Sequence, residues 1–391
     1  MPRLFPFTGL VYDDAVAGPL DRVTAPPYDV ISDARRRGYL AASPFSVVHL
    51  DLAEGNDDPE APDSRYARAA HLLEDWEERG ALRRSGSASF YAYEMAFALQ
   101  GRPHTIRGLF AALELEPWGE LVIPHERTMP GPVGDRLRLL RATRTHLSAV
   151  YGTVAGPCRP LADLLDTVAA SRAPFEALDE QGVRHRMWPV PGDPEVGAWL
   201  AAAPLLVADG HHRYTTALAY RDEQNALNGP GPWDRVLALV VDAASEHLPV
   251  LPFHRVQIAG HPPAIGDRVS RLDDVLAALS DDDVTIGSAR REGAEVVYRV
   301  ASLDGAPPAV RALHETVLEG TAPEGSLRFV PDAGAADAAV VDEGALAAWF
   351  LPATTPERIR AVVERGDRLP QKSTYFWPKP RTGMVMMPVD A

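Results

Sequence analysis

The sequence LLVADGHHRY, from Leu205 to Tyr214, predicts a buried strand, a tight turn and the start of a helix. Its first four residues form a short apolar run, and the residues after Gly210 form one helical face, made of Tyr214, Ala217, Leu218 and Tyr220. The first backbone N–H groups of a helix lack partners within the helix and lie at the positive end of its dipole, so they favour an anion. This stretch therefore predicts a phosphate-binding turn.

Each polar residue of this turn has a candidate role. Gly210 allows the backbone to approach a ligand, Arg213 offers a planar fork of donors to phosphate oxygens, and the backbone amides from Gly210 to His212 complete the site. Asp209 would hold a metal ion such as Mg²⁺, or a hydroxyl group. The alternative is structural, with Asp209 capping the helix and Arg213 paired with an acid. Successive helical residues point about 100° apart, so we expect one of His211 and His212 to face the ligand while the other packs.

The segment PHERT, residues 124–128, follows a strand-like run and predicts a loop at a strand end, where catalytic groups are commonly held. We select Glu126, beside His125, as the general base that receives the proton of a substrate hydroxyl. The alternative is that Glu126 forms an ion pair with Arg127 or Arg136.

Two basic residues are candidates for neutralising phosphate charge. Arg136 belongs to an arginine-rich predicted helix that begins near Asp135, and its structural alternative is a solvated helix face. Lys372, followed by Ser373 and Thr374, resembles phosphate-binding chemistry, but no glycine-rich loop precedes it, so it is not part of a P-loop. We expect Arg136 or Lys372 to stabilise charge that develops during phosphoryl transfer.

These motifs carry two resemblances to known families. VADGHHRY is similar to the DG-x-HR turn of the ParB and sulfiredoxin-like superfamily, whose members bind ATP, ADP or CTP phosphates at this helix start and include free-serine kinases. Six blocks in one order resemble the bacterial and archaeal domain-of-unknown-function family 1015: APPYDVIS (25–32), SVVHLDL (46–52), PHERT (124–128), DRLRLLRATRTHLSAVYG (135–152), ADGHHRY (208–214) and PQKSTYFWPKP (370–380). The second resemblance covers almost the whole chain and implies ATP-dependent phosphorylation of free L-serine.

The first block, APPYDVIS, is the candidate substrate site. Pro26 and Pro27 restrict the backbone before Tyr28 and Asp29. The family resemblance implies that Tyr28 and Asp29 contact a small substrate, with Asp29 binding an amino group. The alternative is that this block is only a rigid turn.

Composition limits the partners and the compartment. Asp and Glu number 54 against 39 Lys and Arg, and the resulting net charge of −15 disfavours nucleic acid as a partner. Cys158 is the only cysteine, so no intrachain disulfide is expected, and the longest uncharged apolar stretch, residues 196–208, is shorter than the roughly 20 residues of a membrane-spanning helix. We therefore expect a cytoplasmic protein without a membrane partner that binds a nucleotide and a small polar metabolite, and we also consider a homodimer.

Local patterns predict a mixed α/β fold with a ParB-like nucleotide-binding core. They indicate a helix over residues 64–82 capped by Ser64, a strand over 47–52, a hairpin joining 109–115 to 121–123, and an aromatic run at 375–377 that docks on the protein. We expect three parts: an N-terminal α/β part (1–120), the ParB-like core with PHERT and DGHHRY (121–258), and a C-terminal α+β part ending in QKSTYFWPKP (259–391).

The sequence thus favours a kinase that transfers a phosphoryl group from ATP, or another nucleoside phosphate, to the hydroxyl of a free amino acid such as L-serine, with Mg²⁺ as cofactor. Two other functions stay open. One is a non-catalytic nucleotide-binding switch of the ParB-like type, and the other is a metal-assisted hydrolase that uses Asp209, Glu126 and the histidines.

Overall fold

The computed structural model of the chain describes residues 3–154, 159–192, 204–243, 248–305 and 307–390. Cys158 and residues 196–203 of the predicted apolar stretch lie outside the described residues. Within the described ranges, no helix combines the length and the apolar character needed to cross a bilayer.

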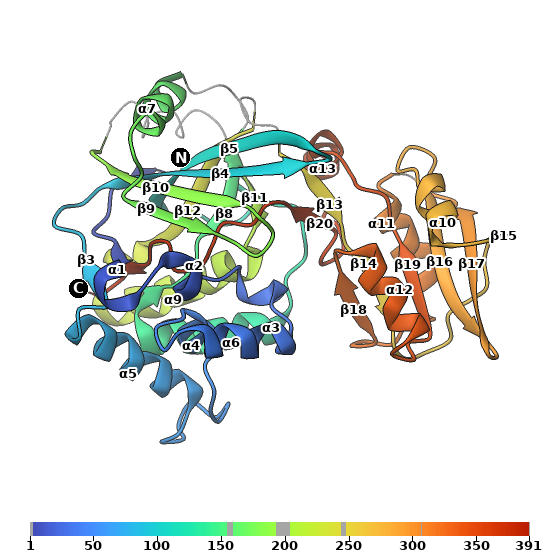
Figure 1. The fold of residues 1–391 in the computed structure, drawn as a ribbon, viewed down its shortest axis with the longest axis horizontal. Helices are drawn as coiled ribbons and strands as arrows, with labels where there is room; N and C mark the ends of the chain where they lie inside the picture. The colour runs from blue at the N-terminus through green and yellow to red at the C-terminus, as the bar shows by residue number, and fades with distance from the viewer. Residues whose placement is uncertain (1–2, 155–158, 193–203, 244–247, 306, 391) are drawn as a thin grey trace. The chain divides into compact units, whose positions relative to one another are not determined.

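The chain divides into two compact units. Unit 1 contains Met1–Pro124, Thr128–His247 and Pro378–Ala391, and unit 2 contains His125–Arg127 and Leu248–Trp377. Unit 2 is therefore almost continuous in sequence, whereas unit 1 is completed by the last residues of the chain. Figure 1 shows these last residues, in red, returning to the blue and green elements of unit 1.

Unit 1 is built on one mixed sheet in which strands distant in sequence pair with each other. Its order is β6 (Val122–Pro124), β11 (Leu205–Asp209), β8 (Val150–Val154), β12 (Arg235–Asp242), β5 (Arg102–Glu114), β4 (Phe90–Leu99), β10 (Arg184–Val190) and β9 (Phe175–Leu178), with β1 (Leu4–Phe5) on β5. β11 runs parallel to β6 and antiparallel to β8. Short two-stranded pairs join β2 (Leu10–Tyr12) to β3 (Leu82–Arg84) and β7 (Thr145–His146) to β21 (Met387–Pro388).

Helices pack against this sheet, whose central strands are buried and apolar. Leu161 and Leu165 of α7 (Arg159–Ala169) and Tyr214 and Ala217 of α9 (His211–Asn228) enter the same buried cluster as the strands. Figure 1 shows α6 (Pro130–Thr143) beside α9. The other helical segments are α1 (Asp14–Ala17), α2 (Leu20–Val23), η1 (Tyr28–Val30), α3 (Asp33–Ala42), α4 (Val48–Asp51), α5 (Arg65–Glu78) and η2 (Pro232–Asp234).

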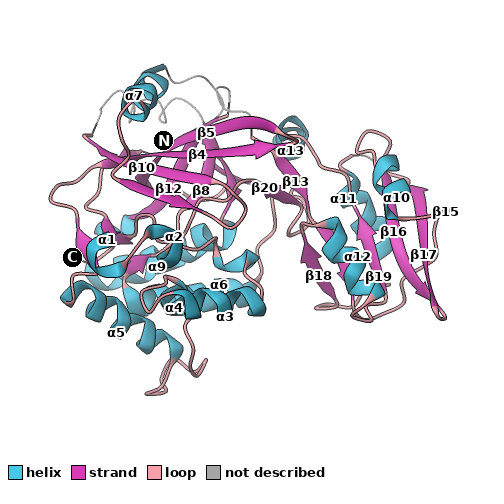
Figure 2. Cartoon of the chain, in the orientation of Figure 1, coloured by secondary structure: helices cyan, strands magenta, loops and turns pink. Residues whose placement is uncertain are grey.

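Unit 2 contains a second sheet of order β15 (Asp267–Val269), β17 (Glu295–Ser302), β16 (Thr285–Glu292), β19 (Ala347–Phe350), β14 (His254–Gln257) and β18 (Leu327–Val330), and a separate pair, β13 (Val250–Pro252) with β20 (Thr374–Phe376). Side chains alternate across strand β19: Trp349 packs with α11 (Ala309–Leu313) and η3 (His314–Leu318), whereas Phe350 packs with α10 (Leu272–Ala278) and α12 (Ala333–Val341). The helices of unit 2, which also include α13 (Pro356–Glu364), are drawn in cyan in Figure 2.

The structure confirms the mixed α/β class and several local predictions. Ser64 caps α5 by accepting from the backbone N–H of Tyr66, and the aromatic residues Tyr375 and Phe376 are buried. The grouping into units differs from the three expected parts, because strands from 1–120 and from 121–258 share the sheet of unit 1.

Two local predictions were wrong. The stretch 47–52 contains helix α4 (Val48–Asp51) rather than a strand, because an apolar run this short fits a buried helical turn as well as a strand. The expected hairpin between 109–115 and 121–123 is absent from the described residues: β5 pairs with β4 and β12, and β6 pairs with β11. A local turn pattern cannot reveal that the true partner lies about 80 residues away in sequence.

Candidate functional site

The predicted strand, turn and helix are confirmed at residues 205–214. β11 ends at Asp209, Gly210 has a φ of 91°, and α9 begins at His211. Glycine suits this left-handed conformation, and a Cβ at this position would lie 3.1 Å from the guanidinium of Arg213. No side chain caps the helix at Gly210, so the helix start relies on other groups for its polar partners.

Two cations bind the carboxylate that ends the strand. The ammonium of Lys379 donates to Asp209 Oδ1, and Arg213 Nη2 donates to Asp209 Oδ2 while its Nη1 donates to the carbonyl of Ala149. The side chains of Asp209, Arg213 and Lys379 are 11%, 9% and 4% exposed. Arg213 therefore pairs with an acid, as the structural alternative stated, and that acid is Asp209 itself. The cluster nevertheless carries one more positive than negative charge.

The two adjacent histidines have different surroundings. His211 is buried and its ring stacks with that of Trp118, with centroids 6.1 Å apart. His212 Nε2 accepts a hydrogen bond of 3.0 Å from the backbone N–H of Met129, just before α6. His211 thus packs against the core, and His212 ties the start of α9 to the start of α6.

Arg136 is buried against two carboxylates rather than solvated. Its Nη1 donates to Asp51 Oδ1 at 2.7 Å, and its Nε and Nη2 donate to Asp135 Oδ2 at 2.8 and 2.6 Å. Asp51 stands at the end of α4, only 5% exposed. The structural alternative, a solvated helix face, is therefore wrong for Arg136, although Arg141 of the same helix is half-exposed.

A cavity of about 40 Å³ lies beside these charges in unit 1, lined by polar and apolar residues that include Asp51, Arg136, His146, Ser148, Arg213 and Thr216. The second carboxylate oxygen of Asp51, Oδ2, is buried and has no hydrogen-bond partner among the described residues. Burial raises the pKa of Asp51, and the positive charges of Arg136 and Arg213 oppose that rise. Such an orphaned carboxylate oxygen at a polar cavity calls for a ligand or water.

The predicted substrate residues Tyr28 and Asp29 lie close to this cluster. The guanidinium of Arg136 lies over the ring of Tyr28, 4.2 Å from its centroid. Burial raises the pKa of Tyr28, as does the negative charge of Asp29. The structure therefore brings the APPYD block together with Arg136 and Asp51 within unit 1.

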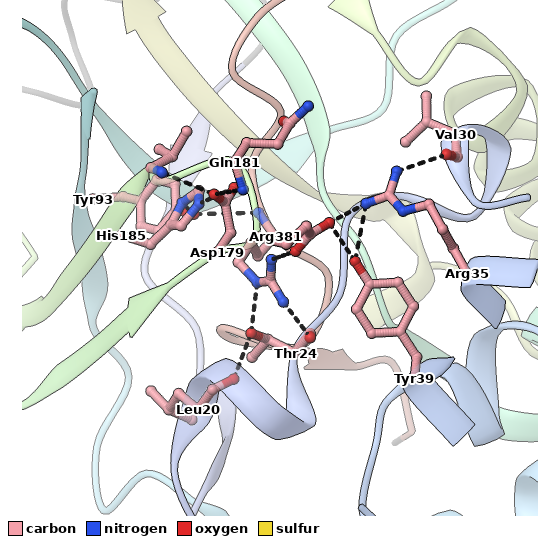
Figure 3. Close-up of polar contacts among 12 residues, drawn as sticks. Leu20, Thr24, Val30, Arg35, Tyr39, Tyr93, Asp179, Gln181, His185 and Arg381 are labelled. Atoms are coloured by element: carbon pink, nitrogen blue, oxygen red, sulfur yellow. Dashed lines mark hydrogen bonds and ion pairs between the residues drawn. The ribbon is translucent and has the colours of Figure 1, made fainter. Parts of the chain in front are cut away.

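The segment after Trp377 holds the APPYD block in place through Arg381. Arg381 Nε donates to Thr24 Oγ1 at 2.7 Å, and Arg381 Nη1 reaches Glu180 at 3.4 Å. Figure 3 shows Arg381 facing Thr24, with His185 between Tyr93 and Asp179 nearby. The backbone N–H of Arg381 donates to the hydroxyl of Tyr93 at 3.2 Å.

The other predicted residues belong to unit 2. Both oxygens of Glu126 accept backbone hydrogen bonds: Oε2 from Lys372 at 2.9 Å, and Oε1 from Ser373 and Thr374 at 2.9 and 3.0 Å. Thr374 Oγ1 also donates to Glu126, so it accepts from His125 Nε2, 2.7 Å away. His125 is fully buried.

These contacts give Glu126 a clear structural task. Its carboxylate holds a tight loop in which Lys372 has a φ of 51°, a conformation that non-glycine residues seldom adopt. The ammonium of Lys372 lies 5.4 Å from the ring centroid of Phe253. This geometry favours loop anchoring for Glu126 over the predicted base role.

Sequence reasoning missed Asp51, Lys379 and Arg381. Asp51 and Lys379 lie inside the quoted blocks SVVHLDL and PQKSTYFWPKP, but no residue in the first block and only Lys372 in the second were selected from the sequence. Lys372 and Lys379 are the only lysines of the chain. Lysine is rare in this chain, which otherwise uses arginine as its basic residue. A lysine differs from an arginine in supplying a compact point charge, and this difference could have pointed to Lys379.

Comparisons with known proteins come from sequence and from structure. No curated protein matches the chain. Among solved structures, a free serine kinase in complex with AMP is 13% identical, with a TM-score of 0.40, and the match covers 72% of this chain and 91% of that one. A mutant free serine kinase in complex with ADP is 13% identical, with a TM-score of 0.39 and coverage of 72% and 92%.

A conserved hypothetical protein from Pyrococcus furiosus is 14% identical, with a TM-score of 0.36 and coverage of 70% and 93%. We base no argument on likenesses this distant. The sequence match is different in kind: the family model described as "Protein of unknown function (DUF1015)" matches residues 4–272, which is more than half of the chain. The chain belongs to the DUF1015 family.

Proposed function

We propose that this protein is a small-molecule kinase that transfers a phosphoryl group from a nucleotide, in the first place ATP, to the hydroxyl of a free amino acid such as L-serine. The observation that carries the proposal is the pairing of Asp209 with both Arg213 and Lys379 at the start of an uncapped helix. Two donors of positive charge and a helix dipole meet where the sequence predicts a phosphate. AMP and ADP are ligands of the free serine kinases, and the proposal rests on the residues of this chain alone.

Nucleotide binding would give Arg213 and Lys379 new hydrogen-bond partners. The cavity of about 40 Å³ is too small for a nucleoside triphosphate, so Arg213 and Lys379 must move from Asp209 to the incoming phosphates. The exchange is balanced electrostatically because phosphate oxygens replace the carboxylate as acceptors. It would release the carboxylate of Asp209.

The carboxylate of Asp209, once released from these ion pairs, would be a suitable ligand for Mg²⁺. This ion is commonly held by one or two carboxylates, several waters and the phosphates of the substrate. Asp209, at the end of β11, is the protein ligand that we assign to this ion. When bound, the ion would neutralise charge on the phosphates.

Asp51 is the base that we assign in unit 1. Its Oδ2 is buried without a partner beside the cavity, and its pKa is raised by burial, which suits a group that must accept a proton. The acceptor hydroxyl would give its proton to Asp51 Oδ2 as its oxygen forms a bond to the terminal phosphorus. The bond from that phosphorus to the bridging oxygen would break, and the nucleoside diphosphate would leave with that electron pair.

Arg136 and the APPYD block would position the acceptor. Arg136 fixes Asp51 through Oδ1 and packs on Tyr28, and Asp29 would bind the amino group of the amino acid, as the family resemblance implies. Glu126 stays the alternative base. If Asp51 is the base, Asp51→Asn should lose turnover, and if Glu126 is the base, Glu126→Gln should lose it.

The decisive experiment is incubation of the protein with γ-labelled ATP, Mg²⁺ and a panel of free amino acids, followed by identification of the labelled product. Label in a phosphorylated hydroxy amino acid supports the kinase. Label only in inorganic phosphate indicates a hydrolase, and unconsumed ATP that still raises the melting temperature indicates a nucleotide-binding switch.

A further inference from the structure

A second cavity, of about 330 Å³, lies entirely within unit 2 and far along the sequence from the phosphate turn. This volume is at the lower end of the range for pockets that bind small molecules. The charged and titratable side chains that line it come from residues 311–319, from residue 368 and from the PHERT block. They are Arg127, Arg311, His314, Glu315, Glu319 and Arg368.

Backbone pairing places two of the arginines at the cavity. Leu369 donates its N–H to the carbonyl of His125 at 2.8 Å and accepts from the N–H of Arg127 at 3.3 Å. Arg127 and Arg368 are exposed, and within the described ranges neither guanidinium has a hydrogen-bond or ion-pair partner. Two unneutralised guanidinium groups therefore border one pocket.

The third arginine is held in position by acids. Arg311 pairs with Asp367 at 3.0 Å and with Glu315 at 3.3 Å. Glu315 is 64% exposed, so solvent screens its charge strongly. The lining itself has three arginines and two glutamates, and Asp367, outside the lining, balances the charge of Arg311.

A buried cation behind the cavity adds to this charge. Arg255 is fully buried, and its Nε donates to His314 Nε2 at 3.2 Å. Burial lowers the pKa of His314 to about 3, so its ring is neutral. A neutral ring that accepts at Nε2 carries its hydrogen on Nδ1, and this N–H is a further donor at a residue that lines the cavity.

The backbone at this point is also unusual. η3, which supplies His314 and Glu315, is a π-helical turn that directly follows α11. Such turns are rare and are often found at functional sites, because they shift side chains out of the regular helical register.

We propose that this cavity is a phosphate-binding site, which takes inorganic phosphate or the phosphate group of a small monoester. Guanidinium forks match the oxygens of phosphate in pairs, and a dianion is the species that balances both Arg127 and Arg368. A carboxylate would leave one of these charges unmatched. None of the residues that line this cavity is among those to which the proposed kinase chemistry is assigned.

The test measures the reactivity of individual arginines in the full chain. The protein carrying Arg213→Ala, which removes the phosphate turn of unit 1, is treated with phenylglyoxal in phosphate or in chloride of equal ionic strength, and modified peptides are quantified by mass spectrometry. At a phosphate concentration about four times Kd, mass action predicts that Arg127 and Arg368 react about fivefold more slowly. Arg360, exposed on α13 and outside the cavity, is the internal control and should react equally in both salts.

A second variant checks that the protection arises in this cavity. Arg368→Ala should abolish the protection of Arg127, whereas Arg360→Ala should preserve it. The same experiment is repeated with glycerol 3-phosphate in place of inorganic phosphate. If glycerol 3-phosphate protects Arg127 and Arg368 at lower concentrations than inorganic phosphate does, the site takes an esterified phosphate. If it protects them only at equal or higher concentrations, the site takes free phosphate. Equal rates for Arg127 and Arg368 in phosphate and chloride, or protection of Arg127 that survives Arg368→Ala, would overturn the proposal.

Discussion

Lys379 donates its ammonium hydrogen to Asp209 across 170 positions of sequence, within unit 1. This contact ties the segment after Trp377 to the carboxyl end of β11. It also puts one of the two lysines of the chain at the predicted phosphate turn. The ion pair is almost fully buried, so it should matter for both stability and binding.

Replacing Lys379 by Met should destabilise the protein by about 1–3 kcal/mol, because the aliphatic stem is kept while a buried carboxylate loses a charged donor. Urea denaturation measures this change. Arg184→Met is the control, since it removes the cation of an exposed ion pair with Glu176, and should cost about 0–1 kcal/mol. Equal losses in the two variants would contradict the importance of the Asp209 pair.

Arg213→Ala should remove most of the rise in melting temperature that ATP with Mg²⁺ produces in the native protein. At a ligand concentration of 100 times Kd the native protein should gain about 2.7 kcal/mol, which is several degrees. The reason is that Arg213 is the guanidinium at the start of α9. Arg184→Ala, which removes an exposed ion pair with Glu176, should leave the nucleotide response intact. An Arg213→Ala protein with an undiminished response would exclude the turn as the phosphate site.

Asp51→Asn should lower kcat for phosphoryl transfer by about 10²–10⁴-fold while nucleotide affinity is kept, because an amide cannot accept the proton of the acceptor. Transfer of label from ATP measures turnover, and thermal shift measures affinity. Asp163→Asn, at an exposed position of α7, should behave like the native protein. Unchanged turnover in Asp51→Asn would remove Asp51 from the mechanism.

Glu126→Gln separates anchoring from catalysis. If Glu126 anchors the loop at residues 372–374, the variant should lose about 1–3 kcal/mol of stability, because an amide can accept only through one oxygen. Urea denaturation beside the turnover assay checks this. Glu364→Gln, at an exposed position of α13, is the control. A Glu126→Gln protein with native stability and no turnover would support the base role predicted from the sequence.

His146 should make stability depend on pH on the acidic side of neutrality. Burial lowers its pKa to about 4, whereas an unfolded histidine has a pKa near 6.5. The unfolded chain therefore binds more protons between these values, so stability falls as the pH falls from about 6.5 to about 4. The full effect is about 3 kcal/mol for a shift of this size.

His146→Gln should flatten that dependence, as measured by urea denaturation at a series of pH values. His254 and His314 have pKa values lowered to about 4 and about 3 by burial, so part of the slope should persist in the variant. A slope unchanged by the substitution would mean that His146 does not titrate as its burial requires.

The sequence predicted best those features that depend on neighbouring residues. The strand, glycine turn and helix at 205–214 follow from a short apolar run, a residue tolerant of positive φ and a helical spacing of apolar side chains. The Ser64 cap likewise depends only on a hydroxyl two residues from its donor. Each of these sequence patterns strongly favours one local backbone conformation.

Features that depend on distant pairing were not predictable. Strand β6 pairs with β11, and Asp209 pairs with Lys379, through register and packing that no local pattern encodes. Asp51 was missed for a related reason: its segment was expected to be a strand, which would not place its side chain at the end of a helical turn beside Arg136.

The return of residues 378–390 to unit 1 imposes an order on biosynthesis. During translation, residues 248–377 leave the ribosome before Lys379 and Arg381, so the sheet of unit 2 can form while the larger unit still lacks these two side chains and its final strand, β21. Asp209 and Thr24 therefore gain these partners only after unit 2 has been synthesised. A nascent chain stalled before residue 378 should thus remain a client of chaperones and lack the Lys379 contact to Asp209 at the proposed phosphate-binding turn.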